Sequence, residues 1–167
     1  MNAVPRPQQA EPVRAREMTL ADLDAVMAVE QAVYPFPWSR GNFVDSLAAG
    51  HVTRVQLGPD GALLGYSVAL PGVDEMHLLN LTVAPGAEGR GLARGLLDAL
   101  VARCRDEHRA WLWLEVRESN QRARAIYRRY GFTDVGLRRG YYPAAQRRED
   151  AIVMRLTVRG GAGDALD

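Results

Sequence analysis

The chain has 167 residues, the size of one ordinary domain, and 47% of them are hydrophobic, which allows a sizeable core. Its 21 basic and 20 acidic residues leave a formal net charge of +1, which argues against the broad positive field of nucleic-acid or membrane-surface proteins. All basic residues are Arg, Cys104 is the single cysteine, and no stretch approaches the ~20 apolar residues of a membrane span. A Schiff-base lysine, an internal disulfide and a cysteine metal cluster are therefore excluded.

The two ends of the chain are predicted to be tails. Residues 1–11 are rich in Pro and Gln, and residues 159–167 in Gly, Ala and Asp, so neither stretch could offset the entropy of ordering it. We therefore expect a disordered N-terminal tail, one domain over residues 12–158, and a flexible C-terminal tail. Because the first residues contain no apolar run of the signal-peptide kind, we expect the protein to be cytoplasmic.

The first half of the domain is predicted to contain two helices and several strands. An alternating stretch at 13–18 suits a strand. A helical pattern then begins at Thr19 and runs through Glu30, and the prolines at 35 and 37 break it. The next expected elements are a helix capped by Ser39 and ended by Gly50, a hairpin of strands 52–57 and 63–70, and a strand at 76–83.

The second half alternates strands and helices, and this order indicates the fold class. A glycine-containing loop at 86–91 leads into a long helix with an apolar stripe from Leu92 to Cys104. The elements that follow are a strand at 111–116, a helix capped by Ser119 or Asn120 and ended by Gly131, and strands at 132–137 and 151–158. Strand, helix and strand in this order predict a right-handed crossover between parallel neighbours, whereas the early hairpin needs antiparallel pairing. We therefore predict an α/β fold with a mixed sheet.

The loop before the long helix is a candidate phosphate site. Backbone N–H groups at a helix start are unsatisfied and attract anions. Gly89 and Gly91 permit close backbone approach, and Arg90 and Arg94 add positive charge. Glycines near a helix start are also common in ordinary loops, so both interpretations stay open. The loop lacks the Lys of a Walker motif and the later acidic partner of a dinucleotide fold.

Glu115 and Tyr127 are the candidates for acid–base chemistry. Trp111, Trp113 and Glu115 share one face of their strand, so Glu115 is either a general base at the mouth of the sheet or a residue that has reached solvent. Tyr127 lies on a helical stripe with Ile126, which is also typical of a core tyrosine.

The histidines give no indication of a metal site, and a group of arginines gives only a weak indication of a docking face. The histidines have no metal-ligand spacing, so we assign them to the surface or to local hydrogen bonds and expect no metal site. The arginines crowd into the last third of the domain, which is typical of a solvated face but also suits docking on an acidic surface or on cofactor phosphates. The histidines are His51, His77 and His108, and the arginines are Arg117, Arg122, Arg124, Arg128, Arg129, Arg138, Arg139, Arg147 and Arg148.

Taken in order, these motifs resemble the GCN5-related N-acetyltransferase (GNAT) superfamily. Within it they are most similar to the bacterial ribosomal-protein-alanine N-acetyltransferases, the RimI type. The resemblance covers nearly the whole domain, and its most specific parts are the strand at 112–117 and the Tyr-Tyr-Pro segment at 141–143. The other segments that carry it are residues 36–39, 80–83, 91–94, 119–120, 125–127, 131–132, 138–139 and 148–151, with Met154.

The resemblance implies a fold and a set of site residues. The fold is a mixed, mostly antiparallel sheet flanked by about four helices, with a central parallel strand pair splayed around acetyl-coenzyme A. Glu115 is implied as the base that deprotonates the amine, Tyr127 as the acid that protonates the thiolate, and Tyr141 and Tyr142 as the border of the acceptor's entrance. The implied cofactor contacts are Leu81, Thr82 and Val83 along the pantetheine arm, Gly89, Arg90, Gly91, Leu92, Ala93 and Arg94 around the pyrophosphate, and Asn120.

The resemblance also implies the reaction. It is the transfer of acetyl from acetyl-coenzyme A to the α-amine of an Ala-starting protein, the small-subunit ribosomal protein eighteen, by direct attack in a ternary complex without a metal. An acetyltransferase for Lys or small amines and a catalytically silent acetyl-coenzyme A-binding module are the alternatives. We expect a monomer or weak dimer that contacts neither nucleic acid nor membrane.

Two positions depart from the family pattern of the loop. Glu88 stands where Gln or Arg is usual, and Ala93 replaces the second glycine, which is a common variant. Because a carboxylate near a pyrophosphate is unfavourable, we expect Glu88 to point to solvent; the departure bears on cofactor affinity more than on cofactor identity.

Overall fold

The computed structural model describes residues 12–158, so both predicted tails lie outside the described residues. This part of the chain forms one seven-stranded sheet in the order β1-β2-β3-β4-β5-β7-β6, with four α-helices. The strands are β1 (Arg14–Arg16), β2 (Val52–Leu57), β3 (Leu63–Pro71), β4 (Glu75–Val83), β5 (Trp111–Arg117), β6 (Thr133–Tyr142) and β7 (Glu149–Thr157). The helices are α1 (Leu23–Val33), α2 (Arg40–Ala48), α3 (Leu92–Asp106) and α4 (Gln121–Tyr130).

The sheet is mixed, as the order of elements predicts. All neighbouring strands pair antiparallel except β4 and β5, which pair parallel because α3 carries the chain back between them. Parallel neighbours need such a crossover, whereas β2 and β3 need only a short turn. The predicted α/β fold with a central parallel pair is confirmed.

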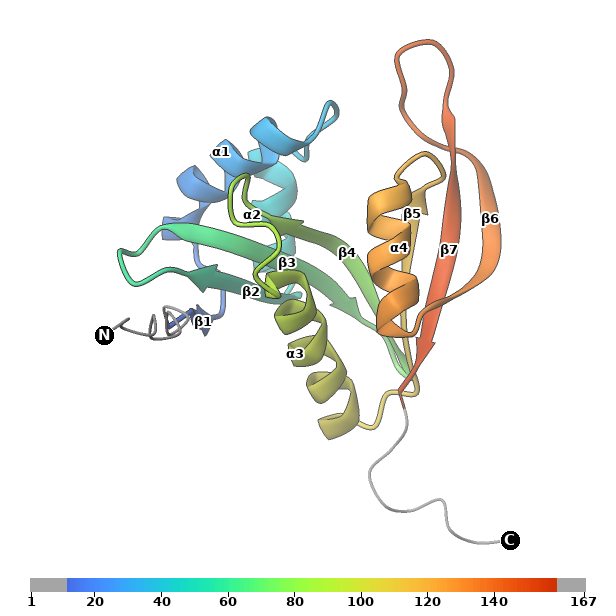
Figure 1. Ribbon diagram of the computed structural model, residues 1–167. Coiled ribbons are helices and arrows are strands. Elements are labelled where there is room, and N and C mark those ends of the chain that lie inside the picture. Colours follow the sequence, from blue (N-terminus) through green and yellow to red (C-terminus); the bar gives the residue numbers. More distant parts are fainter. Residues whose placement is uncertain (1–11, 159–167) are drawn as a thin grey trace, which may run out of the picture.

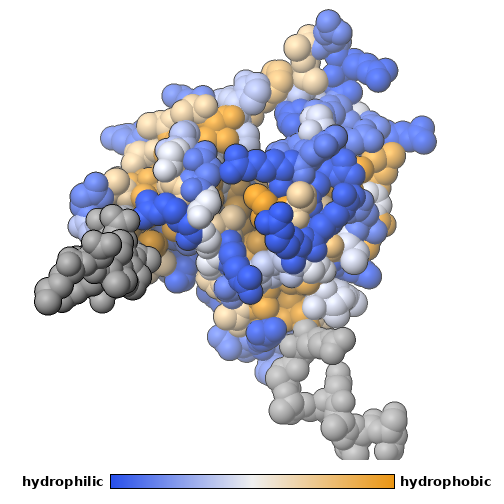
Figure 2. Space-filling view, in the orientation of Figure 1, coloured by the Kyte–Doolittle hydropathy of each residue, from blue (hydrophilic) through white to orange (hydrophobic). Residues whose placement is uncertain are grey.

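Helices cover both faces of the sheet (Figure 1). The largest group of buried side chains lies between the sheet and the pair α3 and α4, and includes Leu78 of β4, Leu97 of α3 and Leu112 of β5. A second group lies under α1 and α2 on the opposite face and includes Val26 of α1 and Tyr66 of β3. From the α3 and α4 side the surface is mostly hydrophilic, with hydrophobic residues visible in its middle (Figure 2).

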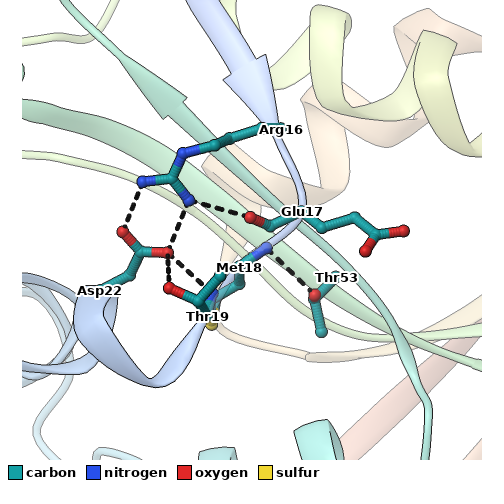
Figure 3. Close-up of polar contacts among 6 residues, drawn as sticks. All are labelled: Arg16, Glu17, Met18, Thr19, Asp22 and Thr53. Atoms are coloured by element: carbon teal, nitrogen blue, oxygen red, sulfur yellow. Dashed lines mark hydrogen bonds and ion pairs between the residues drawn. The ribbon is translucent and has the colours of Figure 1, made fainter.

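The entry into α1 is fixed by a polar contact with β1 (Figure 3). Arg16 donates two hydrogen bonds to the Asp22 carboxylate, each 2.8 Å long, and that carboxylate also accepts a hydrogen bond from the backbone N–H of Thr19 at 2.7 Å. Met18 N–H donates to the Thr53 hydroxyl oxygen at 3.3 Å, which ties the same segment to β2. These contacts join the end of the first strand to the start of the first helix.

Strand β6 differs from the prediction in its length. It runs to Tyr142 instead of ending near residue 137, and its pairing with β7 shifts register twice, between Asp134 and Gly136 and between Arg138 and Tyr142. Such irregularities interrupt the alternation of side chains from which a strand is predicted. Tyr141 and Tyr142 therefore belong to the end of a strand.

The parallel pairing of β4 and β5 is short. It extends over four register pairs, from Glu75 with Trp111 to Leu78 with Leu114, and beyond them the two strands diverge (Figure 1). At the same point β4 has a bulge, because Val68 of β3 pairs with Asn80 and the next residue of β3 pairs with Leu78. A bulge bends its strand away from the regular ladder. The predicted splayed pair is thus present, and it opens at the middle of the sheet.

Candidate active site

Glu115 lies on β5 just beyond Leu114, the last residue of β5 that pairs with β4. Its side chain is only 6% exposed. Its neighbours Leu114 and Val116 are buried in the core under α3 and α4, so the carboxylate points to the opposite face of the sheet. The possibility that the strand has reached solvent at this position is therefore wrong.

Two basic side chains surround the Glu115 carboxylate. His77 of β4 places Nε2 2.6 Å from Oε2, and Arg138 of β6 places Nε 3.3 Å from Oε1. The contact with Arg138 is an ion pair, since it joins a guanidinium nitrogen and a carboxylate oxygen at this distance. Within residues 12–158 Oε1 is buried and accepts no hydrogen bond, so those residues leave its accepting capacity unused.

Aromatic rings hold both basic side chains in place. The His77 ring stacks on Trp113, with centroids 3.6 Å apart and planes 9° from parallel. The Arg138 guanidinium lies 5.8 Å from the centre of the Trp113 ring and 5.6 Å from that of Tyr141. Cations are attracted to ring faces at such distances. His77 of β4 and Arg138 of β6 therefore contact Glu115 from either side, and Trp113 of β5 packs against both of them.

Tyr127 of α4 approaches from the other face of β5. It is 8% exposed within the core under α3 and α4, and its ring meets that of Phe132 at 5.5 Å. Burial raises the pKa of its phenol, and the nearby phenols of Tyr34 and Tyr142 raise it further. The phenol therefore keeps its proton at neutral pH and acts as a hydrogen-bond donor.

Tyr142 connects the surroundings of the two candidates. Burial raises the pKa of Tyr142, and the negative charge of Glu115 is the next cause. The Arg117 guanidinium lies 4.6 Å from the centre of the Tyr142 ring and 5.6 Å from that of Phe36, in the segment between α1 and α2. The end of β6 and the α1–α2 connection thus meet over the candidate base.

The loop before α3 has the backbone conformation that its glycines predict. Gly86, Gly89 and Gly91 have φ angles of 84°, 75° and 75°, in the left-handed region that side chains disfavour. Gly91 is also the N-cap of α3 and supplies no side-chain hydrogen bond to its first turn. The first N–H groups of α3 are therefore suited to an anion.

Comparison with known proteins was made against family models, curated proteins and solved structures. The model of the acetyltransferase (GNAT) family matches residues 23–132, well over half of the chain. The chain belongs to the GNAT acetyltransferase family. A curated relative from Escherichia coli (strain K12), named ribosomal protein bS18-alanine N-acetyltransferase, is 37% identical over 137 residues, covering 82% of this chain and 92% of the relative.

Solved structures of GNAT proteins agree with the fold. The crystal structure of the ribosomal-protein-S18-alanine N-acetyltransferase from Escherichia coli matches with a TM-score of 0.83 at 33% identity, covering 93% of this chain and 99% of that one. A phosphinothricin acetyltransferase from Sinorhizobium meliloti, in complex with AcCoA, shares the fold with a TM-score of 0.73 at 21% identity and covers 93% and 94% of the two chains. As a GNAT protein, this chain is an acetyl-coenzyme A-dependent N-acetyltransferase, which confirms the predicted reaction class and co-substrate.

The residues predicted to bind the GNAT co-substrate lie around the opening between β4 and β5. Leu81, Thr82 and Val83 form the end of β4, beyond its last pair with β5. Asn120 caps α4, its Oδ1 accepting a hydrogen bond from Ala123 N–H at 3.1 Å. Glu88 is exposed as expected, although its carboxylate also accepts a hydrogen bond from Gly86 N–H at 2.8 Å. The cofactor contacts of these residues stay predictions.

Sequence reasoning missed residues that support this site. His77 was assigned to the surface or to a local hydrogen bond, yet it contacts Glu115 across the parallel pair. Glu30 of α1 is 1% exposed, and no motif assigns it a role. Its carboxylate accepts hydrogen bonds from Tyr66 Oη, from Trp38 N–H at 3.0 Å and from Asn80 Nδ2 at 3.2 Å. Helical spacing puts Glu30 on the apolar stripe, which is the one available signal.

Much of the predicted arginine group is engaged in local contacts. Arg117 pairs with Glu149 at 3.1 Å, and Arg128 pairs with Asp134 at 2.7 Å. The Glu149 pKa is lowered, first by its hydrogen bonds with Ser119 and then by Arg117. These pairs favour the interpretation as a solvated face over a dedicated docking face.

Within residues 12–158, no group of His, Cys, Asp and Glu side chains could hold a metal ion. No helix among the same residues is long and apolar enough to cross a membrane.

Proposed function

We propose that this N-acetyltransferase acetylates the α-amine of a protein that begins with Ala, and that this protein is ribosomal protein S18. The observation that carries the proposal is the buried Glu115 carboxylate, with one oxygen held by His77 and the other without a hydrogen-bond donor from the described residues. The relatives named for S18 alanine acetylation, which this chain matches over most of its length, support the same acceptor.

The pKa of the acceptor favours an N-terminus over a lysine. A protein α-amino group has a pKa of ~7.7–8.0 and a Lys side chain ~10.4, so freeing the amine at pH 7 costs about 1.2 kcal/mol for the first and about 4.6 kcal/mol for the second. A single carboxylate is a sufficient base for the smaller of these costs. A lysine acceptor would require more from the same side chain.

The described residues divide the work of the reaction. Acetyl-coenzyme A supplies the acetyl thioester, and the amine nitrogen attacks its carbonyl carbon directly. Glu115 takes the proton from the amine, and Tyr127 donates a hydrogen bond or its proton to the departing sulfur. Because Tyr127 keeps its proton at neutral pH, it can stabilise a thiolate whose parent pKa is near ~8.5. Gly89 to Arg94 would hold the pyrophosphate at the start of α3.

The proposal extends to the location of the reaction, the oligomeric state and the acceptor's entrance. The reaction takes place in the cytoplasm, and the protein acts as a monomer or weak dimer without contacting nucleic acid or membrane directly. Tyr141 and Tyr142 border the acceptor's entrance at the end of β6, and Phe36 faces them across Arg117.

A matched peptide pair tests the acceptor. Acetyl transfer is followed by mass spectrometry on an Ala-starting basic peptide and on the same peptide with a blocked N-terminus and a free internal Lys. We expect transfer to the free N-terminus alone. Transfer to the Lys peptide alone would overturn the acceptor and leave the reaction class intact. No transfer to either peptide, with acetyl-coenzyme A still bound, would favour small amines or a catalytically silent module.

A further inference from the structure

We propose that His77 is a positioning residue for Glu115: it holds Oε2 and so fixes the orientation of the carboxylate that takes the proton from the acceptor amine. This inference rests on the proposed role of Glu115 as the base. It concerns a side chain to which the motifs assign no role, on a strand otherwise expected to contact the cofactor through its backbone.

Contact geometry is the first argument for this role. His77 Nε2 lies 2.6 Å from Glu115 Oε2, within the range of a charge-assisted hydrogen bond. The side chains are 16% and 6% exposed, so water competes little with this contact. A buried carboxylate that makes few hydrogen bonds is costly, and the imidazole N–H provides one of them.

The rigidity of His77 is the second argument. Its register partner across the parallel pair is Trp113, and the two rings stack at 3.6 Å. Trp113 precedes Glu115 by two residues, so both side chains stand on the same face of β5. The indole therefore fixes the plane of the imidazole, and the imidazole fixes Oε2.

The position of the contact within the sheet is the third argument. The pair formed by His77 and Trp113 is the last but one before β4 and β5 diverge. Glu115 therefore stands where β5 is still paired with β7 but no longer with β4, so on the β4 side its carboxylate is held by the His77 side chain. His77 from β4 and Arg138 from β6 approach different oxygens of the carboxylate from different strands.

Two substitutions separate positioning from packing. His77→Phe keeps an aromatic ring to stack on Trp113 but removes the donor. His77→Gln keeps an N–H donor that does not titrate. We expect His77→Phe to lower kcat on the order of tenfold to a hundredfold, with little change in the KM for acetyl-coenzyme A. We expect His77→Gln to recover most of kcat, because it restores the donor without the imidazole ring.

Controls make each outcome decisive. His108→Asn changes an exposed histidine with a φ of 55°, a conformation that Asn tolerates, and should leave the rate unchanged. Thermal unfolding of every variant shows that the fold is retained. His77→Phe added to Glu115→Gln should cause no further loss, because the two residues act as a unit.

Failure of this inference is distinct from failure of the proposed function. An inactive Glu115→Gln together with a fully active, folded His77→Phe would overturn the role of His77 and keep Glu115 as the base. An active Glu115→Gln would overturn the proposed base itself. Equal loss of kcat in folded His77→Phe and His77→Gln would show that the donor of His77 does not position Glu115, and would overturn the inference.

Discussion

Glu115 presents its two carboxylate oxygens to different partners. Oε2 meets His77, while Oε1 lies near Arg138 without a hydrogen bond. Tyr127 lies in the core on the other face of β5. The proposed base and the proposed acid are therefore on opposite faces of this strand, so each can have an environment of its own. A carboxylate among basic groups and a buried phenol differ in the way that acid–base partners require.

Replacement of Glu115 by Gln tests the base. The amide keeps the shape of the side chain but cannot take a proton, so turnover near pH 7 should fall on the order of 10²–10⁴-fold. The loss should shrink above pH ~8, where an α-amine is already largely neutral. Initial rates measured from pH 6 to pH 9 check both statements. Glu118→Gln, an exposed neighbour, is the matched control, and a native rate for Glu115→Gln at pH 7 would remove this residue from the mechanism.

Replacement of Tyr127 by Phe tests the acid. The ring that packs against Phe132 remains, and only the hydroxyl group is lost. We expect kcat to fall by about tenfold or more, because the departing sulfur loses its donor, while the Kd for acetyl-coenzyme A stays nearly unchanged. Calorimetric titration beside steady-state kinetics separates the two quantities. A large loss of cofactor affinity would instead make Tyr127 a structural residue.

A carboxylate lies near the start of α3 and another near the start of α1, and the two have different effects. At the start of α3, glycines with left-handed backbone expose N–H groups, and Glu88 places a negative charge beside them. At the start of α1, Asp22 is neutralised by Arg16 and accepts the Thr19 N–H. The Glu88 carboxylate would repel the pyrophosphate expected at α3. The Asp22 carboxylate instead accepts a hydrogen bond from a backbone N–H that precedes α1.

Replacement of Glu88 by Gln removes the opposing charge at α3. The amide oxygen can still accept the Gly86 N–H, so the loop conformation should be kept. We expect acetyl-coenzyme A to bind about two- to fivefold more tightly, from roughly 0.3–1 kcal/mol of relieved repulsion near the helix start. The gain should shrink at high salt, since exposed charges are screened. Binding isotherms at two salt concentrations measure it, and equal affinity at low salt would place Glu88 away from the pyrophosphate.

Replacement of Asp22 by Asn tests the contact with Arg16. Asp22 accepts hydrogen bonds from Arg16 and Thr19, which outweigh the opposing effect of burial and hold the Asp22 pKa at about 2. In an unfolded chain the pKa of an Asp side chain is ~3.9. The folded value is depressed, so the stabilisation is complete above pH ~4 and is lost as the pH falls through about 2.

Denaturant unfolding at several pH values measures this effect. Since the Arg16 side chain is 48% exposed and water screens the pair, we expect Asp22→Asn to lose at most about 1 kcal/mol of unfolding free energy at pH 7. The difference from the native protein should narrow below pH ~4. A difference that stays constant down to pH 3 would mean that the charge of Asp22 is not its source.

At the scale of the whole molecule, the architecture can be predicted from the sequence more completely than the site can. Periodicity, caps and turn residues predict the two early helices, the hairpin and the crossover, because each of these signals is local. The end of β6 is missed because its register shifts interrupt the alternation. Glu115 stands out in the sequence as a carboxylate after two tryptophans, and the alternation of β5 places it on their face.

The partners of the site are not local, which is why they are missed. His77 meets Glu115 over 38 residues, and Asn80 meets Glu30 over 50 residues. Pairing of β4 with β5 sets the first contact, and packing of α1 on the sheet sets the second. No spacing within one element encodes either of them. A correct register for the parallel pair would place His77 opposite Trp113 and hence beside Glu115.

The short ladder between β4 and β5 gives the sheet an interior edge. Edges normally lie at the rim, where unpaired strands invite association with another chain. Here the strands part after four register pairs, in the middle of the sheet, with α3 and α4 covering one face. Beyond Leu78, β4 pairs with β3 on one side, while on the other its pairing with β5 has ended. The backbone groups on that side are therefore free of the ladder, and an extended molecule with polar groups along it is the kind of ligand that could bond to them.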